Sequence, residues 1–374
     1  MGTPPERPRD MAVTADQARN PNSTEQPVYR WEEAHQNPAA AATPSMRDHG
    51  AMVTVGVVLS AGGHHAAAHH AGVLTALATS TGWDPRSADV MVGTSAGAVT
   101  AVCLRAGLSA ADLAAHYLGL PLSPEGRTIS ARVTTRLHVT DPNLRLPSRR
   151  PANPMLVARE LFVGGRPRPL VALTGLLPDG EVDGSSFAKR AEQLHPGPWP
   201  TEATWLCAVD LNNGRRMVFG RDDVETTVGP AVQASTAVPG YFAPVEIGGR
   251  RYVDGGVHSS TNADLLAPLH LDLVVVSSSK TRSPTVDSPG DGSLARAWHS
   301  RTLRREVELI AARGTTVLVL QPTTTDLATR GSSDMDDTTT LQVCANGRDS
   351  ALARLGHPGA VAARRLLEEA TPPA

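Results

Sequence analysis

Several residue types are scarce in this chain, and each scarcity excludes a class of protein. Its three cysteines, Cys103, Cys207 and Cys344, are far apart, and an odd number argues against a disulfide framework. Aromatic residues make up 3% of the chain, and Lys189 and Lys280 are the only lysines among 35 basic residues, which we interpret as codon bias. No apolar stretch approaches the roughly 20 residues that cross a bilayer. Because 37 acidic residues balance the basic ones, no general positive field attracts nucleic acid. We expect a soluble, cytoplasmic protein.

The composition also divides the 374 residues into a tail and one folded domain. Residues 1–50 have almost no aliphatic periodicity, so they bury too little apolar surface to offset the entropy of ordering. We expect a disordered tail there and one domain over residues 51–374. Within it, residues 121–200 are dense in proline and arginine, and we interpret them as an irregular insertion, or cap, with helices only at 157–162 and 187–194.

The alternation of strand and helix patterns predicts the fold class. Residues 52–59 are apolar on both faces, which is typical of a buried parallel strand, and an alanine-rich helix follows at 66–78. A strand at 88–93 leads into a second apolar helix that ends near Gly107. Further strands are predicted at 204–211, 215–220, 250–256, 271–279 and 315–322, and helices at 229–237, 293–314 and 359–370. This order predicts an α/β fold around a mostly parallel sheet.

The most informative motif is Gly93-Thr94-Ser95-Ala96-Gly97, which lies between a predicted strand and a predicted helix. Small neighbours permit the sharp turn that exposes a serine nucleophile, and the amides of the following helix point towards charge developing there. The pattern alone is common in a chain rich in glycine and alanine. The alternative is that Ser95 only caps its helix.

Two other glycine-containing turns also follow predicted strands. In Ser60-Ala61-Gly62-Gly63-His64, small residues leave backbone amides free to converge on an anion, as an oxyanion hole requires. It lacks the Lys of a phosphate-binding P-loop and the full dinucleotide-binding pattern. The second turn begins at Asp254, a carboxylate at a strand end where a base for a serine would be placed. For both segments the alternative is an ordinary tight turn.

Together, and in this order, the three motifs resemble those of the patatin-like phospholipases. They are Gly62-Gly63, Gly93-Thr94-Ser95-Ala96-Gly97 and Asp254-Gly255-Gly256. The run at residues 234–257 (ASTAVPGYFAPVEIGGRRYVDGGV) is also typical of that family, as is Gly72-Val73-Leu74 after the first turn. The similarity covers residues 53–267 and extends more faintly to 322. Three ordered motifs are far more specific than any one of them.

The resemblance implies a three-layer α/β/α sandwich and a serine–aspartate dyad without a histidine. Ser95 would attack an ester carbonyl, Asp254 would accept its proton, and backbone amides of Gly62, Gly63 and His64 would form the oxyanion hole. The small residues that would shape the two catalytic turns are Gly93, Gly97, Gly255 and Gly256. The implied substrate is a phospholipid or another acyl ester, reached by transient contact with a membrane surface. No cofactor or metal is implied.

The first turn departs from the family pattern, which usually reads G-G-G-x-[Arg/Lys]-G. The corresponding residues are Ala61-Gly62-Gly63-His64-His65-Ala66. Whichever end is aligned, the basic residue and at least one glycine are lost. One alternative is therefore a catalytically impaired member that binds lipid or a partner protein.

A cluster of histidines follows the same turn: His64, His65, His69 and His70. On a helix only His65 and His69 could approach one metal ion, and no Cys, Asp or Glu lies near them in the sequence. We expect no metal, and we expect these histidines on the helix surface or the rim of the site. There, one of them could supply positive charge near the oxyanion.

A further alternative is an α/β-hydrolase-like esterase with a Ser-His-Asp triad. His258, four residues after Asp254, is its best third member, although an ordinary loop histidine fits as well. Asn262 is a candidate for orienting the Asp254 loop, the alternative being a turn residue.

Overall fold

The computed structural model describes residues 53–137, 152–153, 156, 169–283, 294–330 and 338–371. All of these residues belong to the unit Gln36–Ala374. The predicted tail at 1–50 and the predicted helix at 157–162 lie outside the described residues.

The centre of this unit is an eight-stranded sheet with the order β5-β6-β3-β2-β1-β7-β8, and β4 pairs with β3 beside this path. The strands are β1 Val55–Leu59, β2 Val90–Thr94, β3 Ala203–Asp210, β4 Arg216–Phe219, β5 Val245–Ile247, β6 Arg250–Asp254, β7 Leu273–Ser277 and β8 Thr316–Leu320. Strands β3, β2, β1, β7 and β8 are parallel, whereas β4, β5 and β6 join antiparallel. The predicted mostly parallel sheet is therefore confirmed. The short β5 was not predicted.

The register of the central strands sets where their ends lie. Leu59, the last residue of β1, pairs with Gly93 of β2 on one side and with Ser277 of β7 on the other. Because the three strands are parallel and aligned, the turns that follow them leave the sheet at the same edge. Residues far apart in the sequence meet there.

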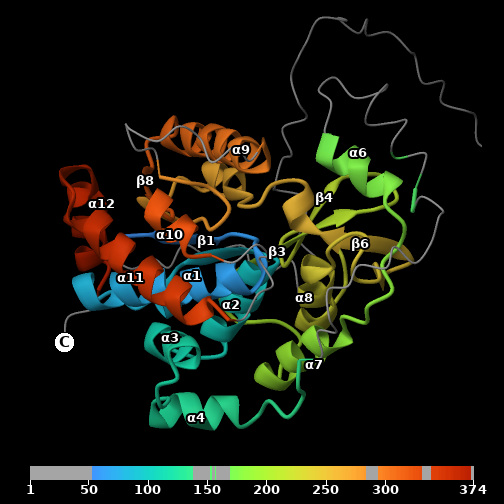
Figure 1. Cartoon of the computed structure of the whole chain (residues 1–374), viewed down its shortest axis with the longest axis horizontal. Coiled ribbons are helices and arrows are strands. Elements are labelled where there is room, and N and C mark those ends of the chain that lie inside the picture. The colour runs from blue at the N-terminus through green and yellow to red at the C-terminus, as the bar shows by residue number, and fades with distance from the viewer. Residues whose placement is uncertain are drawn as a thin grey trace, which may run out of the picture. The chain divides into compact units, whose positions relative to one another are not determined.

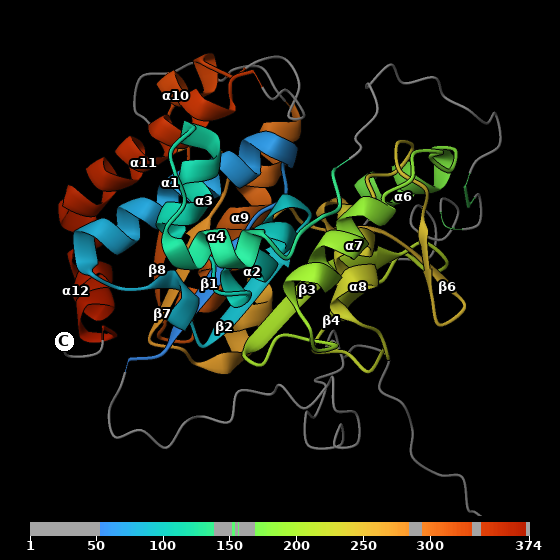
Figure 2. The ribbon, with the colours of Figure 1, turned by 90° about the horizontal axis from the view of Figure 1, so that it is seen from below.

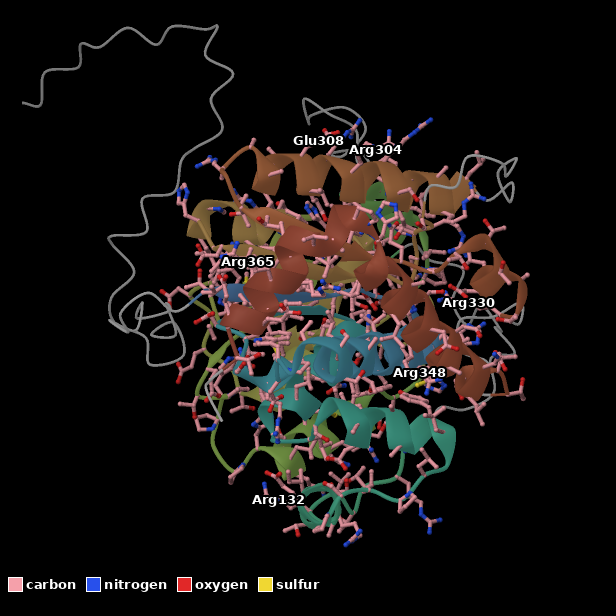
Figure 3. All side chains as sticks on the ribbon, turned by 90° about the vertical axis from the view of Figure 1, so that its left-hand side faces the viewer. Arg132, Arg304, Glu308, Arg330, Arg348 and Arg365 are labelled. Atoms are coloured by element: carbon pink, nitrogen blue, oxygen red, sulfur yellow. The ribbon has the colours of Figure 1, made fainter. Side chains whose placement is uncertain are left out.

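Helices cover both faces of the sheet, which confirms the three-layer α/β/α arrangement (Figure 1). On one face lie α1 (Gly63–Thr81), α2 (Ala96–Arg105), α11 (Thr340–Gly356) and α12 (Val361–Glu369). The other face is covered by α9 (Leu294–Ala311) and the 3₁₀ segment η4 (Ala263–Leu269). Figure 3 shows Arg304 and Glu308 on the side of α9 that faces away from the sheet, where both are exposed.

Helices α1 and α11 approach each other closely at Gly72. A Cβ atom there would lie 2.1 Å from the carbonyl oxygen of Cys344. Helix α11 was not predicted, because Asn346 and Gly347 interrupt its sequence and no regular apolar stripe marks it. It packs along one side of α1, where Gly347 lies close to His69 and the α11 N-cap, Thr339, is hydrogen-bonded to His65.

The predicted insertion at residues 121–200 contains three described helices, α4 (Pro124–Ser130), α6 (Pro169–Leu176) and α7 (Ser185–Leu194). The helix predicted at 187–194 corresponds to α7, which packs against α8 (Val228–Thr236) beside β3 (Figure 2). Helices α4 and α6 were not predicted, nor were α3 (Ala110–Leu118) and the short α10 (Thr324–Ala328). Among the described helices, none combines the length and apolar character needed to span a bilayer.

Candidate active site

Ser95 occupies a sharp turn between β2 and α2. Its backbone has φ 56° and ψ −119°, a conformation that is strained for a residue with a side chain. The flanking glycines are required by close packing, since a Cβ atom at Gly97 would lie 2.0 Å from the carbonyl oxygen of Leu59 and one at Gly93 would lie 2.6 Å from Cα of Ala98. The Ser95 side chain makes no capping hydrogen bond to α2. The turn therefore presents the hydroxyl instead of using it as a cap.

A second serine holds this turn from the opposite side. The amide of Ser95 donates to Oγ of Ser235 in α8 at 2.9 Å, and the same hydroxyl donates to the carbonyl oxygen of Cys207 in β3 at 2.7 Å. Ser235 is fully buried. Its role was not predicted, although it belongs to the run at 234–257 that resembles the patatin-like family.

Asp254 ends β6 and faces Ser95. The Ser95 hydroxyl lies close enough to its carboxylate to favour the ionised form, and the amide of Gly256 donates to Oδ1 at 2.7 Å. Ser95 and Asp254 are 7% and 5% exposed, so both are largely shielded from water. Burial raises the pKa of Asp254, while the Ser95 hydroxyl, the Gly256 amide and the charge of Lys280 lower it in part. The pKa stays above its usual value.

The third turn brings backbone amides to the same place. Gly62 and Gly63 have φ 144° and 60°, and α1 begins at Gly63, so its first-turn amides have no partner inside the helix. Among the described residues, neither glycine amide donates to another backbone group, whereas the amide of Ala61 donates to the carbonyl oxygen of Ser260 at 2.8 Å. A Cβ atom at Gly256 would lie 3.1 Å from Cβ of Ala61. The structure thus brings all three predicted motifs together.

The family model of patatin-like phospholipases matches residues 57–267, more than half of the chain, and this match contains the three turns. The chain belongs to the patatin-like phospholipase family.

Among solved structures, the chain is similar to VipD from Legionella pneumophila, with 12% identity, a TM-score of 0.37, and coverage of 82% of this chain and 67% of that chain. It is also similar to the type III effector protein ExoU, with 14% identity, a TM-score of 0.32, and coverage of 81% and 53%. It thus spans about half of the ExoU chain. No curated protein matches it. Family membership supports a lipid acyl hydrolase function in general.

A buried network supports two of the turns of this patatin-like site. Asn262 donates from Nδ2 to Oγ1 of Thr94 at 3.0 Å, which agrees with an orienting role but places its contact on the serine turn. On the same loop, Ser259 and Thr261 donate through their hydroxyls, and Ala263 through its amide, to the carboxylate of Glu306. The loop at residues 259–263 thus connects α9 to the serine turn and, through the Ser260 carbonyl, to the glycine turn.

Glu306 was missed in the sequence, although a signal was present. On α9 the buried residues are Leu303, Glu306 and Ile310, so a carboxylate occupies an otherwise apolar stripe. Burial, followed by the negative charge of Asp264, raises the pKa of Glu306 to about 7. An acidic residue within an apolar helical stripe is thus a signal of a buried polar network.

Three of the four clustered histidines are not on the surface, so that prediction was wrong. His65, His69 and His70 are buried, and only His64 is partly exposed. His70 bridges two strand ends, with Nδ1 2.7 Å from Oγ of Ser277 and Nε2 2.8 Å from the carbonyl oxygen of Ser60. Burial lowers the pKa of His70 to about 4, so this ring carries no charge near neutral pH. In the described parts of the chain, no group of three metal-ligating side chains converges.

His258 lies near a different carboxylate. Burial opposes ionisation of Asp264, but the guanidinium of Arg216 outweighs it and lowers the pKa, with a smaller contribution from His258. Arg216 binds Asp264 through two hydrogen bonds of 2.7 and 2.8 Å. Among the described residues, the groups that act on the charge of Asp254 are Ser95, Gly256 and Lys280, and His258 is not one of them.

Proposed function

We propose that this member of the family hydrolyses fatty-acyl ester bonds of phospholipids or related lipids, with Ser95 as nucleophile and Asp254 as base. The observation that carries this proposal is the placement of the Ser95 hydroxyl, in a strained turn, beside the buried carboxylate of Asp254, whose ionised form it favours. A serine hydroxyl is a weak nucleophile until an adjacent base accepts its proton. The strained turn, the shielding from water and the nearby glycine amides are what such a reaction needs.

In the acylation step, Oγ of Ser95 attacks the ester carbonyl carbon while its proton passes to Asp254. The carbonyl oxygen becomes an oxyanion, which the amides of Gly62, Gly63 and His64 would stabilise. The bond from this carbon to the alcohol oxygen then breaks, and the proton on Asp254 passes to the departing alcohol. Ser95 is left as an acyl ester.

In the deacylation step, the same carboxylate takes a proton from a water molecule that attacks the acyl carbon. The bond between this carbon and Oγ of Ser95 then breaks, the proton returns to Ser95, and a fatty acid leaves. One base serves both halves of the reaction because the second half is the reverse of the first with water replacing the alcohol.

Labelling with a fluorophosphonate tests the proposal directly, because this reagent forms a covalent bond with an activated serine. We expect labelling of the wild-type protein and none of Ser95→Ala, with Asp254→Asn strongly impaired. A hydrolysis screen of short-chain esters and then phospholipid vesicles would define the substrate. If wild type and Ser95→Ala are labelled equally little, the site is not catalytic and the hypothesis of an impaired, binding member is favoured.

His258→Ala is the matched control for the choice of base. We expect it to retain labelling, because His258 lies near Asp264. A loss as deep as that of Asp254→Asn would instead favour a Ser-His-Asp triad.

A further inference from the structure

Lys280 follows a strand whose end lies next to the proposed oxyanion turn. It comes three residues after the end of β7, and β7 and β2 are the two neighbours of β1 in the sheet. Leu59 is paired with both Gly93 and Ser277. The ends of three adjacent parallel strands therefore carry the serine turn, the glycine turn and Lys280.

Hydrogen bonds fix the Lys280 segment against the glycine turn. The amide of Ser279 donates to Oγ of Ser60 at 2.9 Å, and the amide of Ser60 donates to the carbonyl oxygen of Ser277 at 3.1 Å. On its other side, Nη1 of Arg330 donates to the carbonyl oxygen of Ser279 at 3.0 Å. The backbone that carries Lys280 is thus held at a defined place.

The side chain of Lys280 lies beside Gly62. A Cβ atom at Gly62 would lie 3.4 Å from Cγ of Lys280 and 3.1 Å from Oγ of Ser279. The absent side chain of Gly62 therefore leaves room for the stem of the lysine. At the same time, the ammonium group is near enough to Asp254 to act on its charge. Lys280 thus has its stem beside Gly62 and its charge within range of the Asp254 carboxylate.

We propose that Lys280 supplies the fixed positive charge of this site, holding Asp254 in its ionised form before the reaction and stabilising the oxyanion beside Gly62 during it. This inference rests on the proposed function. When the proton leaves Ser95, negative charge moves from the Asp254 carboxylate to the substrate oxygen; the charge of Lys280 acts on the carboxylate, and its stem lies beside Gly62. A preorganised cation in a water-poor site is an effective stabiliser of such charge.

Two other basic groups close to this turn act differently. The buried ring of His70 is neutral near pH 7, and Arg330 binds the backbone of Ser279.

The test compares pH profiles of ester hydrolysis for Lys280→Met, Lys280→Arg and the control Lys189→Met, which removes the other, exposed lysine. The charged and polar groups that act on Asp254 in the described structure are Ser95, Gly256 and Lys280. Losing the cation should move the acid limb of kcat/KM to higher pH, because the charge of Lys280 favours the ionised form of Asp254. It should also lower kcat on the plateau by roughly tenfold or more, as loss of an oxyanion-stabilising group does. Lys280→Arg, which keeps a positive charge, should show little of either change, and Lys189→Met should match wild type.

A chemical rescue keeps the test valid if Lys280→Met folds poorly. Lys280→Cys alkylated with 2-bromoethylamine regains an ammonium, whereas alkylation with iodoacetamide gives a neutral group, and wild type treated in the same way controls for the native cysteines. We expect recovery only with the amine. An unmoved acid limb and unchanged kcat in Lys280→Met, with labelling that still depends on Ser95, would overturn the role of Lys280 alone. Absence of Ser95-dependent labelling in wild type would overturn the proposed function, and this inference with it.

Discussion

Ser235→Ala should damage the serine turn while leaving Ser95 and Asp254 in the chain. The Ser235 hydroxyl accepts from the Ser95 amide at 2.9 Å and donates to the Cys207 carbonyl at 2.7 Å. Removing it leaves a buried amide without an acceptor. Since the backbone of Ser95 is strained at φ 56°, this amide is one of the groups that hold the turn in place.

The expected loss of stability in Ser235→Ala follows from these two hydrogen bonds. An unsatisfied buried donor costs about 1–3 kcal/mol, and a lost neutral hydrogen bond costs about 1 kcal/mol. The Cys207 carbonyl lies in a strand of the sheet, whose backbone hydrogen bonds reduce the cost of losing the bond from Ser235. We therefore expect a loss of about 2 kcal/mol in the free energy of unfolding. Displacement of the nucleophile by about 1 Å can lower the rate on the order of 100-fold. We therefore expect a large fall in kcat with little change in KM.

The assay pairs urea unfolding with hydrolysis of a short-chain ester. Thr236→Val is the matched control, because it removes a buried hydroxyl from the next residue of α8, where that hydroxyl bonds only to carbonyl groups of its own helix, Val232 and Gln233. Such internal bonds add little to stability. The reasoning is refuted if Ser235→Ala and Thr236→Val are equally stable and equally active.

Three further predictions concern neighbouring groups. Because burial raises the pKa of Asp254 and the base must be ionised, hydrolysis should fall with decreasing pH at a midpoint above the usual 3.8, and a pH profile of kcat/KM measures this. Gly97→Ala should fail to fold stably, as seen by circular dichroism, since its Cβ would lie 2.0 Å from a backbone oxygen of Leu59. Glu306 has a pKa raised from 4.5 to about 7, so the folded state holds this proton more tightly than the unfolded state. The wild type should therefore lose stability relative to Glu306→Gln as pH rises from 4.5 to 7. Urea titrations at these two pH values measure the difference in free energy of unfolding between the two proteins, and a constant difference would contradict the raised pKa.

The sequence predicted those features that short segments encode. The parallel strands were recognised because both of their faces are apolar. The turns at Gly62 and Ser95 were recognised because each follows such a strand, and Asp254 because it ends a shorter strand before two glycines. Helix α11 was missed because its burial depends on contact with α1, near Gly72, more than 270 residues earlier in the chain. The same reason applies to three of the histidines, whose surroundings are completed by distant segments.

The roles of Ser235, Lys280 and Glu306 were out of reach for a related reason. Each acts through a few contacts with residues distant in the sequence, and a single serine, lysine or glutamate carries no local pattern. Of the three, only Glu306 is marked in the sequence, as an acidic residue within the apolar stripe of α9. Pairings of this kind are set by strand order and register, which a single sequence does not specify.

The family match ends at residue 267, but the fold does not. Strand β7, which pairs directly with β1, begins at Leu273, and Leu367 of α12 is fully buried in the core cluster that includes β1. A protein shortened to the matched residues would lose β7 beside β1, α9 from one face of the sheet, α11 and α12 from the other, and Lys280. The smallest piece that keeps this sheet and both helical layers therefore extends to α12, and boundaries for truncation or domain exchange should be placed by the sheet.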